Sequence, residues 1–68
     1  MPNTLETMID DAIIRGLTEG KRASLRTVLQ TRFGSIPETL EQRIGAADMD
    51  ALDAMIARAA VAERIDDV

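Results

Sequence analysis

Carboxylate side chains are the residues of this sequence best suited to chemistry, because two acids close together can bind Mg²⁺ or share a proton. They form three groups: Asp10-Asp11, Asp48-x-Asp50 with Asp53, and Asp66-Asp67. The middle group stands where a helix is expected to begin, and acids there are stabilised by the helix dipole. It also lacks the mid-loop Gly and terminal Glu of a calcium loop. A structural role explains these acids better than a metal site, so we expect no metal and no cofactor.

The sequence lacks the residue pairs that nucleophilic catalysis commonly uses. Its 68 residues include no His and no Cys, so nucleophile–base pairs of the Ser-His or Cys-His kind cannot form. The serine candidates are Ser24 and Ser35, and Ser35 is expected to cap a helix. Gly16-x-x-x-Gly20 is a spacing of small residues and is not a phosphate-binding loop. The sequence therefore predicts a protein that is not an enzyme.

Three arginines form a basic ridge if the chain from residue 4 to 33 is helical. Arg15, Arg22 and Arg26 then lie within about 40° of one another around the helix axis. The ridge can face an acidic partner or phosphates, or it can be an ordinary solvated face with Glu19 interleaved. No aromatic residue accompanies it, and the net charge of the chain is −4. Both facts argue against direct nucleic-acid binding.

The size of the chain points to association with another protein. A domain this short buries only about 60% of its unfolded surface and is marginal alone. The usual additions, disulfides and zinc sites, are excluded by the absence of Cys and His. The apolar fraction is 46%, yet it includes a single Phe and no Trp or Tyr, so the core is thin. We therefore expect the chain to bind itself or another protein.

Apolar residues at i, i+3 and i+4 spacing predict two stripes on the first half of the chain. The first stripe comprises Leu5, Met8, Ile9, Ala12, Ile13 and Gly16, and the second comprises Leu25, Val28, Leu29 and Phe33. On one helix these stripes point in nearly opposite directions. Either the helix breaks near Gly16 and Gly20 and the first stripe folds back, or it is continuous and the first stripe is an oligomer interface. The absence of a Pro, Asn or Asp turn cluster favours a continuous helix.

Residues typical of helix ends predict the remaining elements. Asn3 can cap the first helix, Gly34 can end it with φ > 0, and Asp48 can cap a third helix. Between them, Ser35 and Glu38 fit a capping box with Pro37 in the first turn of a second helix. That helix ends at the sequence Gly-Ala-Ala of residues 45–47, and a last turn or short helix spans 62–68.

These signals predict an all-α fold in which a long N-terminal helix is followed by a compact bundle of two to three short helices. Residues 1–20 are expected to serve oligomerisation, and residues 21–68 to form a small helical module. The predicted core comprises Leu25, Val28, Leu29, Phe33, Leu40, Ile44, Leu52, Met55, Ile56 and Ile65.

From about Lys21 onward the chain resembles the small helical domain of unknown function that ends many Rpn-family recombination-promoting nucleases and transposase-like proteins. The resemblance is carried by Arg32-Phe33-Gly34, Pro37-Glu38, Arg43-Ile44, Ala46-Ala47-Asp48, Leu52, Arg58-Ala59, Ala62 and Ile65-Asp66-Asp67-Val68. Met55 stands where many members carry Trp. The nuclease domain itself is absent, so no catalytic residue is transferred.

The resemblance implies a function. In that family the module holds subunits together, and some members also produce it as a free small protein that restrains the nuclease. A chain of this size beginning at Met1 is similar to such a product. This implies an antitoxin-like inhibitor that assembles with itself, as a dimer or tetramer, and with a full-length Rpn-type nuclease, through Leu5, Met8, Ile9, Ala12, Ile13 and Gly16.

Two rival functions remain open from the sequence. The acidic C-terminal half also suits a mobile-element or phage protein that binds and inhibits a host protein. A DNA-binding regulator is disfavoured, because its recognition helix would carry Arg58 against Asp50 and Asp53. Without Cys, without a signal-like N-terminus and without a long apolar run, the chain is expected to be cytoplasmic and not to enter a membrane.

Overall fold

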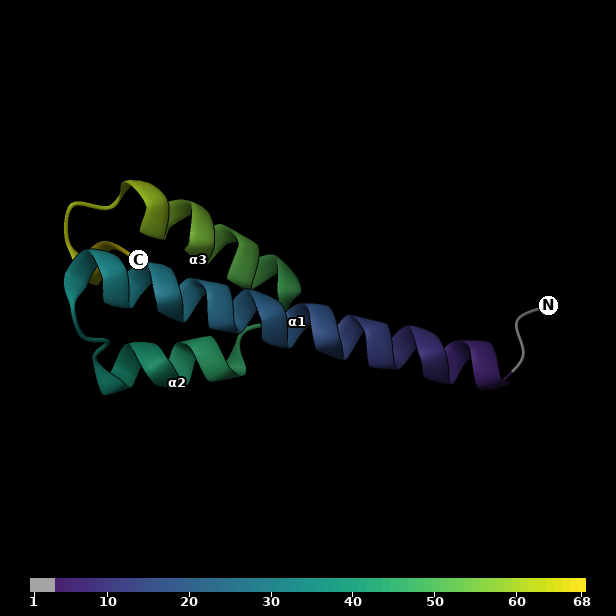
Figure 1. Cartoon of the computed structure of the whole chain (residues 1–68). Helices are drawn as coiled ribbons and strands as arrows, with labels where there is room; N and C mark the ends of the chain where they lie inside the picture. Colours follow the sequence, from purple (N-terminus) through teal and green to yellow (C-terminus); the bar gives the residue numbers. More distant parts are fainter. Residues whose placement is uncertain (1–3) are drawn as a thin grey trace.

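The computed structural model describes the backbone of residues 4–68 and the side chains of residues 11–68. Three α-helices follow one another, α1 (Thr4–Phe33), α2 (Glu38–Ala46) and α3 (Met49–Val61), and a 3-10 turn, η1 (Ile65–Asp67), comes last. No strand occurs between residues 4 and 68. The predicted all-α fold, with a long first helix and shorter ones after it, is confirmed (Figure 1).

The first helix is one continuous element of 30 residues. It runs through Gly16 and Gly20 without a break, so the continuous alternative is confirmed. At 1.5 Å per residue it is about 45 Å long. Its C-terminal half lies with α2 and α3, whereas its N-terminal half extends beyond them into solvent (Figure 1). The chain consequently measures 48 × 20 × 16 Å, with a radius of gyration of 14.4 Å against about 11 Å for a compact domain of this length.

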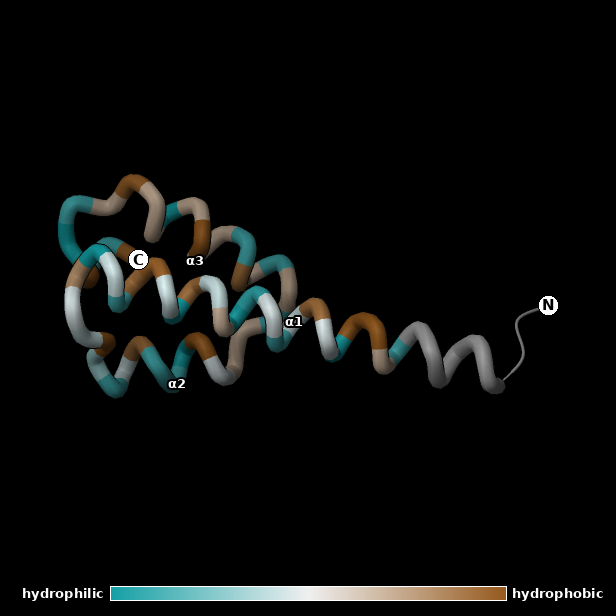
Figure 2. The backbone as a smooth tube through the Cα atoms, viewed as in Figure 1, coloured by the Kyte–Doolittle hydropathy of each residue, from teal (hydrophilic) through white to brown (hydrophobic). Residues whose placement is uncertain are grey.

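The hydrophobic core lies where the three helices meet at the C-terminal half of α1. Its largest fully buried side chains are Leu25, Leu29, Ile44 and Leu52. The other buried apolar residues are Leu40, Met55, Ala59, Ala62 and Val68, and those packed against the core while partly exposed include Val28, Phe33, Ile36, Ala47, Ile56 and Ile65. Every position predicted for the core is therefore either buried or in contact with it. Figure 2 shows that all three helices carry hydrophobic positions in the part of the molecule where they lie together.

The corner between α1 and α2 agrees with the prediction at Gly34 and differs from it at Ser35. Gly34 has φ +88° and its N–H donates to the carbonyl of Gln30 at 2.9 Å, which closes α1. The capping box was wrong, because α2 begins at Glu38 with Pro37 as its N-cap and no side-chain capping bond. A Ser35 cap requires helical dihedrals at Ile36, and the residue before a proline disfavours them. Pro37 is extended instead, with ψ 147°, and its carbonyl accepts from Glu41 at 3.0 Å.

The remaining helix ends follow their sequence signals. Asp48 is the N-cap of α3, and its side chain accepts from the N–H of Ala51 at 2.8 Å, as predicted. The second helix ends at Ala46, within the Gly-Ala-Ala sequence. Ala62 caps the C-terminus of α3, and η1 then returns Val68 to the core. The predicted Asn3 cap lies outside the described residues.

Candidate interaction surfaces

The projecting half of α1 exposes large apolar side chains. Ile13, Ile14 and Leu17 keep 55%, 50% and 54% of their surface in contact with solvent. Of the predicted interface residues, Ala12, Ile13 and Gly16 are exposed, while the side chains of Leu5, Met8 and Ile9 lie outside the described part. Ile14 and Leu17 were missed, although Leu17 continues the i+4 spacing from Ile13. We call Ile13, Ile14 and Leu17 the apolar patch.

Covered side chains of α1 begin only after the apolar patch. Side chains 11–17 are all exposed, and Thr18 is the first that is partly covered. Lys21 forms an ion pair with Asp53 in the second turn of α3, and Arg22 reaches the end of α2. Residues 4–17 therefore project roughly 20 Å from the bundle. Because α1 is continuous, this half cannot fold back to cover its own patch.

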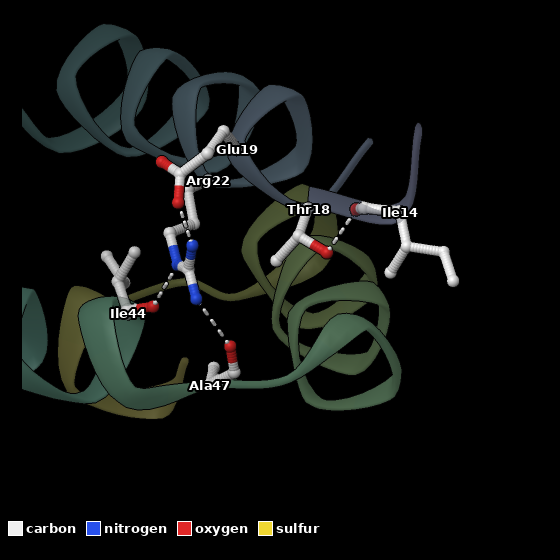
Figure 3. Close-up of polar contacts among 6 residues, drawn as sticks. All are labelled: Ile14, Thr18, Glu19, Arg22, Ile44 and Ala47. Atoms are coloured by element: carbon white, nitrogen blue, oxygen red, sulfur yellow. Dashed lines mark hydrogen bonds and ion pairs between the residues drawn. The ribbon is translucent and has the colours of Figure 1, made fainter. Parts of the chain in front are cut away.

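The basic ridge is largely used inside the bundle. Arg22 donates from Nε to the carbonyl of Ile44 and from Nη2 to that of Ala47, both at 3.1 Å, and it pairs with Glu19 (Figure 3). Arg26 pairs with Glu41 of α2 at 3.0 Å. These two arginines hold α2 against α1.

The third ridge residue, Arg15, stands on the projecting half and is exposed. With the other two arginines engaged by α2 and Glu19, the ridge does not present three free guanidinium groups to a phosphate backbone. The predicted alternative, a solvated face with Glu19 interleaved, agrees with the pairing of Glu19 and Arg22. It was wrong about solvation, because Arg22 and Arg26 are partly buried against α2.

Three members of the acidic groups have structural roles in the bundle. Asp48 caps α3, Asp53 pairs with Lys21, and Asp67 lies 3.9 Å from Arg64. Among the described residues, no three potential metal-ligating side chains come together. Asp10 lies outside the part whose side chains are described, so the pair Asp10-Asp11 stays a sequence observation.

A second surface is a groove between α2 and α3, which sequence reasoning missed. It has a volume of about 300 Å³ and is lined by Arg43, Ala46, Ala47, Ala51, Ala54, Met55 and Arg58. No residue of α1 lines it. The available signal was the spacing of Ala51, Ala54 and Arg58 on one face of α3. We call this hollow the α2–α3 groove.

The two arginines of the α2–α3 groove differ in their contacts. Arg43 donates from Nη1 to the carbonyl of Val68 at 3.1 Å, which ties α2 to the last turn of the chain. Arg58 forms no ion pair with any of the described residues. The groove thus combines a largely apolar lining with two positive charges.

Comparisons with protein-family models, with curated proteins and with solved structures found no match to this chain. The resemblance to the Rpn-family module therefore remains a prediction from the sequence. Across the described residues, no helix combines the length and the apolar character that crossing a membrane requires.

Proposed function

We propose that this chain is a non-enzymatic association module, which binds a partner chain through the N-terminal half of α1, and that this partner is a second copy of the chain. The observation that supports it most is the apolar patch, three large side chains about half exposed on a helix that projects from its own bundle. Contiguous exposed apolar surface of this kind marks an interaction site.

Energetics support the same proposal. The core contains one half-buried Phe, one Met and otherwise aliphatic residues, in a chain of 68 residues. Domains of this size are marginal when no disulfide or metal helps them. A second chain that covers Ile13, Ile14 and Leu17 removes apolar surface from water, at about 25 cal/mol per Å². Association therefore stabilises both the fold and the projecting helix.

A nuclease of the Rpn type is the wider partner that we propose on the sequence resemblance. A self-complementary surface accepts any chain that carries the same module, so homo- and hetero-assembly use the same residues. A free module would then occupy the place of a nuclease subunit and restrain the enzyme. The test is co-purification with a full-length nuclease, with and without substitutions in the apolar patch.

The direct experiment compares two double variants by sedimentation velocity. Ile13→Asp with Leu17→Asp puts two charges on the apolar patch, and we expect a folded monomer. Thr27→Asp with Thr31→Asp is the matched control, because it places two acids at the same spacing on an exposed face of α1 within the bundle. The control should keep the mass of the unmodified chain. An unchanged mass in both variants would exclude the apolar patch as the interface.

A further inference from the structure

The α2–α3 groove is an unoccupied surface within one chain. On α2, Glu41 faces α1 through its ion pair with Arg26, and on α3, Asp53 does so through Lys21. The exposed groove residues lie on other faces of α2 and α3 than Glu41 and Asp53. These faces point away from α1. Since α1 contributes no residue to the lining, nothing from this helix fills the hollow.

The shape of the groove suits a helix with large apolar side chains. Besides its two arginines, the groove is lined by Ala46, Ala47, Ala51, Ala54 and Met55. Small residues allow a neighbouring helix to approach closely, and large side chains on that helix then fill the hollow. The volume of about 300 Å³ is more than a single side chain fills, so several residues of one face are needed.

The charge of the groove selects an acidic occupant. Arg43 and Arg58 are its charged lining residues, and no acid lines it. Arg58 has no ionic partner among the described residues, whereas most basic residues of the bundle contact an acid or a backbone carbonyl. A helix with carboxylates beside its apolar face would be attracted to these two arginines.

The projecting half of α1 has both properties. Before Arg15 the sequence contains Glu6, Asp10 and Asp11 and no basic residue. Ile13, Ile14 and Leu17 follow on the same helix, each about half exposed. The helix is continuous and leads away from the bundle, so it cannot enter the groove of its own chain (Figure 1). A second copy can supply it.

We infer that the α2–α3 groove of one copy binds the N-terminal half of α1 from a second copy. In this contact Asp11 of the second copy lies beside Arg58. This inference rests on the proposed function and specifies its acceptor surface. It predicts a contact between different surfaces, α1 to groove, and not one between two α1 helices. If the second copy returns the contact, the dimer closes around a two-fold axis.

The test measures the dissociation constant by sedimentation equilibrium. Arg58→Glu replaces attraction by repulsion at the groove and should raise the dissociation constant about tenfold. Arg64→Glu is the matched control, because it makes the same change of charge on an exposed residue outside the groove. Adding Asp11→Arg to Arg58→Glu should bring the constant back toward that of the unmodified chain.

A steric pair of variants provides a second readout. Ala54→Trp occupies part of the groove and should weaken association, whereas Ala57→Trp adds the same side chain to an exposed position of α3 outside it. Far-ultraviolet circular dichroism checks that all variants keep their helices. The inference is overturned if Arg58→Glu and Ala54→Trp dissociate no more readily than their controls, or if Asp11→Arg restores nothing.

The outcomes separate this inference from the proposed function. If the chain associates, and Ile13→Asp with Leu17→Asp abolishes this while Arg58→Glu leaves it unchanged, then α1 is the interface and the groove is not. If the unmodified chain is a monomer at every concentration, both proposals fail together.

Discussion

The guanidinium of Arg22 binds the carbonyl of Ile44, with 3.1 Å between Nε and the carbonyl oxygen. A second bond of the same length, from Nη2 to Ala47, satisfies another carbonyl at the end of α2. The carbonyl of Ile44 also accepts from the N–H of Ala47 at 3.3 Å, so the charged fork of donors adds to one capped carbonyl and binds a second one at the end of α2. This contact lies close to where α1 leaves the bundle, since the described side chains before Thr18 are all exposed.

Replacing Arg22 should therefore destabilise the bundle. Arg22→Gln removes the fork and should lower the free energy of unfolding by about 1–3 kcal/mol. Arg15→Gln on the projecting half is the control and should change it by less than about 0.5 kcal/mol. Urea denaturation at one fixed protein concentration measures both, because association also affects apparent stability. Equal urea midpoints for Arg22→Gln and Arg15→Gln would show that the bonds of Arg22 to α2 do not stabilise the bundle.

The two glycines at helix ends should respond oppositely to alanine. Gly34→Ala places a Cβ on a residue with φ +88°, which should cost about 1–2 kcal/mol. Gly45 lies within α2 with φ below zero and open space around an added Cβ. Gly45→Ala should thus stabilise by about 0.5–1 kcal/mol. Thermal melts measure both changes. Shifts of the same sign in the two melting temperatures would contradict the positive φ of Gly34.

Asp48 and Ser35 test the observed capping pattern. Asp48→Ala removes the acceptor for the N–H of Ala51 and should cost about 1 kcal/mol. Ser35→Ala removes a hydroxyl that makes no capping bond, and we expect no measurable change. The same denaturation experiment decides this. A loss at Ser35 as large as that at Asp48 would restore the capping box.

Leu29 and Leu17 separate folding from association. Leu29 is fully buried, and Leu29→Ala should lower the free energy of unfolding by about 2–5 kcal/mol. Leu17 is 54% exposed on the projecting half, so Leu17→Ala should leave the unfolding of the monomer nearly unchanged and weaken association. Denaturation at a concentration where the chain is monomeric gives the free energy of unfolding of the monomer. Sedimentation gives the strength of association. A large loss of monomer stability for Leu17→Ala would show that the patch folds inward.

Local signals made much of the fold predictable. The i, i+3, i+4 spacing of Leu25, Leu29 and Phe33 depends only on helix geometry, and Gly34 and Asp48 act within a few residues of themselves. The capping box failed because two local rules compete at one place. The restriction that Pro37 imposes on Ile36 prevailed over the Ser-x-x-Glu pattern.

The surfaces were harder to predict because they depend on contacts distant in sequence. Arg22 and Arg26 bind residues that lie 15 to 25 positions further along the chain. The α2–α3 groove exists only once both helices are placed, and nothing in the spacing of Ala46 and Ala54 fixes their distance. Ile14 and Leu17 were missed since the first stripe was assigned from the i, i+3, i+4 series that begins at Leu5.

Sedimentation equilibrium of the unmodified chain over a wide range of concentrations shows whether the projecting half of α1 joins two copies. We expect a mass that rises with concentration from 7.4 kDa toward a whole-number multiple of it. A folded chain that stays at 7.4 kDa throughout, with Ile13, Ile14 and Leu17 exposed, would contradict it.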